Sequence, residues 1–160
     1  MSKSNDISVE DKVAIEAVIL EHNWRSDHGL QEKAADLYEE DAVITGVINV
    51  SGREALRAIA RQDPPDLKQR HVTTNLRLMP LADGTVQATT YTAVYRHRGD
   101  GSSDTTPGAI VDSTFMFRRS ADGQWRIMRR DDSIVFRAVG PGGPGSPTAP
   151  SAKAPEPSRN

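Results

Sequence analysis

The spacing of hydrophobic and polar residues changes near residue 69. Before it, apolar residues recur at intervals of three and four, which is typical of one face of an α-helix. After it, the chain runs in long stretches rich in Val, Ile, Thr, Tyr and Phe, the residues favoured in β-strands. The pattern therefore predicts an α+β domain in which helices precede a sheet.

The first predicted helix begins at Ser8, which forms a capping-box pattern with Asp11, and continues through about Trp24. At 3.6 residues per turn, one face collects the residues that we expect to point toward the core: Val13, Ala17, Leu20, Trp24 and then Asp27. This interpretation directs a carboxylate into the interior of the domain.

Two further helices are expected before the sheet. Gly29 ends the first helix, and residues 30–38 read as a second one. A short extended stretch over residues 41–50 follows. Ser51 and Glu54 repeat the capping-box pattern and begin a third helix, which Pro64 and Pro65 end.

Four long strands are predicted, and tight turns at residues 82–84 and 121–123 join two pairs of them. Their ranges are 69–79, 85–98, 108–119 and 124–137. Long strands in an antiparallel meander form a strongly curved sheet, and the helices are suited to fill its concave side. The predicted fold is an α+β barrel or cone, a curved antiparallel sheet wrapped around three N-terminal helices.

The domain is expected to span residues 8–138. Residues 1–7 are expected to be a flexible N-terminus, and residues 139–160, dominated by Pro, Gly, Ser and Ala, a disordered tail. A chain of 160 residues has room for one core and one small pocket.

Composition narrows the classes of function. A net charge of -2 gives no basic field for nucleic acid, and no apolar run approaches the roughly 20 residues that cross a bilayer. The chain has no Cys and no secretion signal at its start, so we expect a cytoplasmic protein. The four His residues lack paired spacing and no Gly-rich phosphate loop follows a strand, so no metal and no cofactor are expected.

Asp27 and His71 are the candidate catalytic residues. A carboxylate on a buried helix face is costly unless it is paired, and His71 opens the first long strand, within possible reach of that helix. An imidazole held by a carboxylate through one ring nitrogen can take a proton through the other. The alternative is a solvated Asp27 at a helix end and an ordinary strand histidine.

Strand alternation leaves the direction of His71 open. His71 and Thr73 share one face with Asn75, whereas Val72 and Leu76 share the other. If the apolar face lined the concave side, His71 would point away from Asp27. A polar pocket or a β-bulge would restore the pair.

Three segments of the chain, with the spacing between them, resemble a known family. They are residues 15–38, with Asp27 before a short second helix, residues 71–78 (HVTTNLRL) and residues 123–127 (GQWRI). Together they are similar to the SnoaL-like branch of the nuclear transport factor two-like superfamily, and within it to scytalone dehydratase, hexachlorocyclohexane dehydrochlorinase and bile-acid dehydratase. The likeness covers about residues 8 to 137.

This resemblance implies roles for individual residues. His71 would be the general base, Asp27 would orient it, and Arg130 would stabilise a departing anion or an enolate oxygen. Arg129 is a rival for that role, because alternation sends the two arginines to opposite faces. Trp24 would be a pocket wall that binds substrate, or plain core packing.

Some alternatives stay open at this point. Arg130 could instead pair with an aspartate, and the candidates are Asp131, Asp132 and Asp112. Asp112 could also enter the pocket as a further acid. The spacing of the tyrosines does not match the family pattern, and His22, His28 and His97 show no obvious partner in the sequence.

The predicted function is that of a cofactor-independent lyase, dehydratase or isomerase acting on a small hydrophobic molecule. A non-catalytic ligand-binding or accessory domain of the same fold, or a polyketide cyclase, is the alternative. We expect a homodimer or homotrimer, with Phe115, Phe117 or apolar residues of the last strand supplying the contact surface.

Overall fold

The computed structural model describes residues 6–98 and 106–138. Along the chain the elements are α1 (Val9–Asp27), α2 (Gln31–Ala34), the 3-10 turn η1 (Ala35–Leu37), β1 (Tyr38–Thr45), β2 (Val50–Ser51), α3 (Arg53–Ala60), β3 (Leu67–Pro80), β4 (Val86–Arg98), β5 (Ala109–Arg119) and β6 (Trp125–Arg137). The predicted tail and residues 1–5 of the predicted flexible N-terminus lie outside the described residues.

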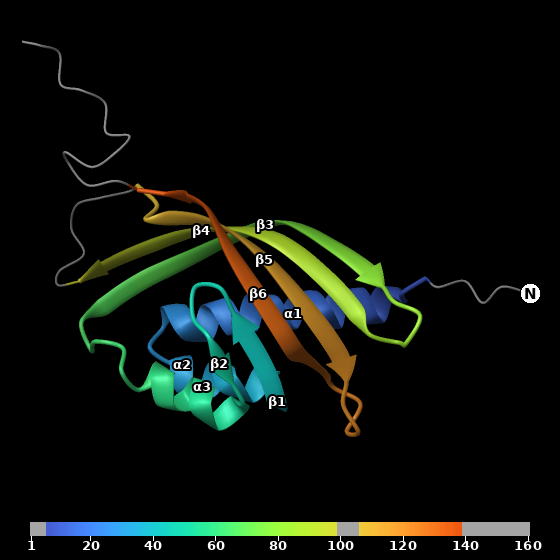
Figure 1. Cartoon of the computed structure of the whole chain (residues 1–160). Coiled ribbons are helices and arrows are strands. Elements are labelled where there is room, and N and C mark those ends of the chain that lie inside the picture. The colour runs from blue at the N-terminus through green and yellow to red at the C-terminus, as the bar shows by residue number, and fades with distance from the viewer. Residues whose placement is uncertain (1–5, 99–105, 139–160) are drawn as a thin grey trace, which may run out of the picture.

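The six strands form one sheet in the order β2-β1-β6-β5-β4-β3. Figure 1 shows a strongly curved, open sheet with the three helices on its concave side. The predicted α+β architecture is therefore confirmed. Neighbouring strands pair antiparallel, except that β1 runs parallel to β6. None of the helices within the described ranges is long and apolar enough to cross a membrane.

The segment between α1 and β3 confirms one local prediction and contradicts another. The predicted second helix is present as α2 followed directly by η1, and it ends one residue early because Tyr38 already begins β1. The third helix is capped by Gly52 at a φ of 90°, and the side chain of Ser51 does not cap it. A positive φ favours glycine, and the sequence pattern of Ser51 and Glu54 gave no sign of this backbone geometry.

The predicted buried face of α1 is also wrong. Val13, Leu20 and Trp24 are 60%, 52% and 51% exposed, whereas Ile15 and Ile19 are buried. Both faces of this helix carry apolar residues, so periodicity alone does not decide which one meets the sheet. Packing against the concave sheet selects the face of Ile15 and Ile19, and Asp27 is the last helical residue beyond it.

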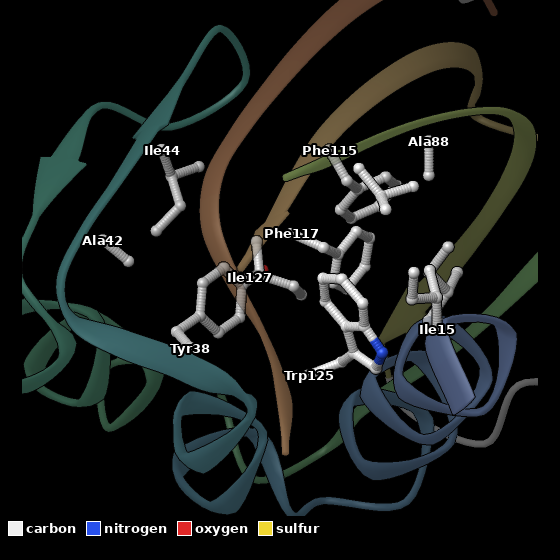
Figure 2. Close-up of a cluster of buried hydrophobic side chains, with 11 residues drawn as sticks. Ile15, Tyr38, Ala42, Ile44, Ala88, Phe115, Phe117, Trp125 and Ile127 are labelled. Atoms are coloured by element: carbon white, nitrogen blue, oxygen red, sulfur yellow. The ribbon is translucent and has the colours of Figure 1, made fainter. Parts of the chain in front are cut away.

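The core lies between α1 and the inner face of the sheet. Its side chains come from α1 and from every strand except β2 and β3, as Figure 2 shows for the labelled residues. Phe115 and Phe117 belong to this core, 4% and 0% exposed, so the expectation that they supply an oligomer surface is wrong. Inward-facing strand residues are used to cover α1 and are not free for a partner.

The N-terminal turn of α1 is fixed to the end of β5 and the start of β6. Ser8 accepts a hydrogen bond from the backbone N–H of Asp11, which confirms the predicted N-cap. The Asp11 carboxylate in turn accepts a 2.9 Å bond from Nε1 of Trp125 and pairs with Arg119. These bonds hold the helix across the sheet and thereby set where its C-terminal end lies.

Candidate active site

A β-bulge in β3 decides which way His71 points. The register between β3 and β4 shifts between Thr74 and Arg77, and Asn75 lies there at a φ of 57°. Before the bulge, His71 and Thr73 face inward. After it, Leu76 and Leu78 turn inward and pack on the core. One extra residue reverses which alternate side chains of the strand face inward. The same strand therefore supplies a polar wall of the pocket and an apolar wall of the core.

Asp27 and His71 are in direct contact. The Asp27 Oδ1 atom lies 2.6 Å from the Nδ1 atom of His71, and Oδ2 accepts a 2.9 Å bond from the His71 backbone N–H. The two side chains are 8% and 17% exposed. Two bonds from one carboxylate fix both the ring and its strand, and Nε2 has no hydrogen-bond partner within residues 6–98 and 106–138. The arrangement leaves that nitrogen able to exchange a proton with a ligand.

His71 lines a hollow on the inner side of the sheet. The empty space in this hollow, including its opening to solvent, is about 540 Å³. Its polar lining includes His71, Thr73, Thr92, Arg130 and Asp132, and Val94, Val111 and Phe115 contribute apolar surface. A few polar groups on an apolar wall are typical of small-molecule sites.

Arg130 enters the hollow from β6. Its Nε donates to Asp132 Oδ1 at 2.9 Å, and Ser113 donates to the same oxygen at 2.7 Å. Burial lowers the pKa of Arg130, but Tyr38 and Asp132 more than offset this, so its pKa is raised above the ordinary arginine value. The guanidinium is thus a permanent positive charge in the hollow, paired with a carboxylate that is itself 4% exposed.

His22 and Tyr38 lie behind Arg130. The Tyr38 hydroxyl is 3.1 Å from Nε2 of His22, and Nη1 of Arg130 is 3.4 Å from the same nitrogen. Burial, followed by repulsion from Arg130, lowers the pKa of His22 to about 3. Burial also raises the pKa of the Tyr38 hydroxyl. At neutral pH both side chains are therefore uncharged hydrogen-bonding groups next to a charged one.

The other candidate residues lie elsewhere. Arg129 points to the outer face and pairs with Asp131 at 2.7 Å, so the predicted alternation of the two arginines holds. The proposed alternative partner of Arg130 is also present, because Asp132 binds it inside the hollow. Trp24 stacks on His28 and does not line the hollow, and Asp112 is exposed. A role for Trp24 as a pocket wall and for Asp112 as a pocket acid is thus not supported by their positions.

Sequence reasoning missed several residues of the site. His22 lies one helical turn beyond Ile19 on the buried face, a signal that was available once that face was known. Thr73 follows from simple alternation with His71. Tyr38 reaches the site only because β1 lies beside β6 in the sheet, a long-range pairing that no local pattern shows.

Comparison with known proteins identifies the family. A SnoaL-like domain model matches residues 8–131, which is most of the chain. The chain belongs to the SnoaL-like domain family. This agrees with the resemblance noted in the sequence. No curated protein matches, and the described residues contain no cluster of three side chains suited to hold a metal ion.

Solved structures similar to this SnoaL-like domain share its fold. A putative scytalone dehydratase from Novosphingobium aromaticivorans is 16% identical with a TM-score of 0.70, and the match covers 81% of this chain and 87% of that one. An NTF2-like protein with a cystatin-like fold from the same organism is 23% identical, with a TM-score of 0.66 and coverages of 79% and 83%. A protein from Catenulispora acidiphila in complex with S-DNPA is 25% identical, with a TM-score of 0.68 and coverages of 79% and 95%.

Proposed function

We propose that this SnoaL-like domain is a cofactor-independent acid–base enzyme, a dehydratase-type lyase or an isomerase, acting on a small hydrophobic molecule. The observation that carries the proposal is the 2.6 Å contact between Asp27 and His71 at the wall of a hollow that also contains Arg130. The cytoplasmic location and the homodimer or homotrimer stay predictions from the sequence.

In the proposed reaction, Nε2 of His71 takes a proton from a carbon of the substrate. Asp27 holds the ring through Nδ1 and stabilises the imidazolium that forms. In a dehydration the electron pair of the C–H bond forms a double bond to the neighbouring carbon as the C–O bond on that carbon breaks, and the proton on His71 passes to the departing oxygen, so that water leaves. In an isomerisation the pair forms a new double bond as an existing one shifts, and the proton returns to a different carbon.

Arg130 is proposed to stabilise the negative charge that builds up on the substrate. Its side chain is held by Asp132, so its direction is fixed before a substrate arrives. A preorganised positive group in an enclosed site stabilises a developing anion without having to reorganise during the reaction. The apolar side chains of the hollow support a substrate with little charge of its own.

The test is proton exchange at an activated carbon. The ketone 2-tetralone has C–H bonds next to a carbonyl, and their replacement by deuterium in D2O is followed by proton NMR. We expect the wild-type protein to accelerate exchange and His71→Ala to lose the acceleration by about a hundredfold or more. His97→Ala, at an exposed position on β4, is the matched control and should behave as wild type.

Equal exchange rates for wild type and His71→Ala would contradict the proposed base. A folded protein that binds the ketone without accelerating exchange would favour the alternative, a non-catalytic ligand-binding domain of the same fold. Circular dichroism of each variant shows whether the fold is retained.

A further inference from the structure

A chain of hydrogen bonds runs from Arg130 toward the sheet wall of the hollow, and its donors can be assigned one after another. Arg130 has only donors, and its Nη1 atom lies 3.4 Å from Nε2 of His22 and 3.5 Å from the Tyr38 hydroxyl oxygen. The Tyr38 hydroxyl, 3.1 Å from Nε2, therefore donates to it. Nε2 of His22 is thus an acceptor and has no hydrogen.

The state of His22 fixes the next bonds. A neutral imidazole without hydrogen on Nε2 carries it on Nδ1, which lies 3.2 Å from Oδ1 of Asn23 and donates to it. With its oxygen engaged there, Asn23 uses its Nδ2 atom to donate to Oγ1 of Thr73 at 2.8 Å. Thr73 therefore receives a hydrogen bond from the helix side.

The chain ends at a pair of hydroxyls, Thr73 and Thr92, with 2.9 Å between their oxygens. The two hydroxyls have two hydrogens, and the bond between them uses one, whichever of them donates. The second hydrogen has no acceptor in the described part of the chain. Both residues line the hollow, and Thr92 is 7% exposed. A buried donor without an acceptor is costly, so this hydrogen is available to whatever fills the hollow.

We propose that the Thr73 and Thr92 hydroxyl pair binds an oxygen of the substrate and that the substrate is a carbonyl compound. The inference rests on the proposed function, in which His71 removes a proton. Thr73 follows His71 by two residues on one strand face, about 7 Å along the strand. An oxygen about 3 Å from the hydroxyls and a carbon about 3 Å from His71 can then belong to one group, in which they are two bonds apart.

A carbonyl oxygen meets both requirements. It accepts the free hydroxyl hydrogen, and it makes the neighbouring C–H bond acidic. When His71 takes the proton, the electron pair moves onto that oxygen as an enolate, and the hydrogen bond becomes stronger because its acceptor is then charged. The hydroxyl pair acts in this scheme by positioning and polarising the substrate, whereas His71 makes and breaks the bond to hydrogen.

The test compares two ligands of the same shape. Binding of 2-tetralone and of tetralin, its hydrocarbon counterpart without oxygen, is measured by ligand-observed NMR titration on the full chain. Either single Thr→Val variant still has one free hydroxyl hydrogen, so the decisive protein is the double variant Thr73→Val/Thr92→Val. In that variant we expect the dissociation constant of the ketone to rise about fivefold relative to that of tetralin.

The matched control is Thr89→Val/Thr114→Val, a threonine pair in register on the opposite face of β4 and β5. This control should keep the wild-type ratio. A purely structural role for Thr73 and Thr92 would weaken both ligands alike and leave the ratio unchanged, and that result overturns the inference. Failure of wild type to bind the ketone also overturns it, whereas unchanged exchange in His71→Ala contradicts only the proposed base.

Discussion

Acidification should destabilise the fold through His22. The pKa of this side chain is about 3 in the fold, against an ordinary value of 6.5. The fold favours the neutral ring. The contribution of this ring to the stability of the fold is therefore complete above about pH 6.5 and is lost as the pH falls toward 3. At about pH 5 the unfolded chain has bound a proton that the folded chain has not. From about pH 6.5 to about pH 5, an interval of about 1.5 units, the free energy of unfolding therefore falls by about 2 kcal/mol.

This magnitude depends little on the folded pKa, because pH 5 lies well above it. Arg130 of β6, His71 of β3 and Arg25 of α1 all disfavour a positive charge on His22. The Tyr38 hydroxyl of β1 also faces His22, as an uncharged group. Asn23 acts in the opposite direction through its hydrogen bond, but burial outweighs it.

Urea unfolding at about pH 7.5 and pH 5, followed by tryptophan fluorescence, measures the effect. Wild type and His97→Gln, a control at an exposed position, should each lose about 2 kcal/mol more than His22→Gln between the two pH values. Equal losses in all three proteins would refute the enclosed, neutral state of His22. They would also remove the basis for the tautomer assigned above.

Three further predictions follow from local geometry. A Cβ on Gly46 would lie 1.8 Å from the Asp132 carbonyl oxygen, so Gly46→Ala should lose more than about 3 kcal/mol of unfolding free energy in urea. Gly84→Ala, also at positive φ but with open space around its Cβ, should lose only about 1 kcal/mol. Asp27→Asn should slow ketone exchange about a hundredfold while the fold survives in circular dichroism, and wild-type rates would exclude its role. Trp125→Phe removes the 2.9 Å bond to Asp11 and should lower the thermal midpoint by the equivalent of about 1 kcal/mol, whereas an unchanged midpoint would show that this bond adds nothing.

Much of the candidate site could be anticipated from single residues. Asp27 and His71 were chosen by residue type, position and family resemblance, and the structure brings them into contact. Alternation correctly sent Arg129 and Arg130 to opposite faces. The surroundings could not be anticipated in the same way, because His22 and Tyr38 meet Arg130 through contacts between elements far apart in the chain.

The sequence by itself determined the order of helices and strands, the long strands with their turns, and the α+β class. These features follow from side-chain periods of 3.6 and 2 and from local turn chemistry, which act between near neighbours. Only the tertiary structure decided which face of α1 is buried and that a bulge at Asn75 reverses which side chains of β3 face inward. Both depend on packing a two-faced helix into a curved sheet, where the burial of one face is chosen by the partner surface and not by the segment itself.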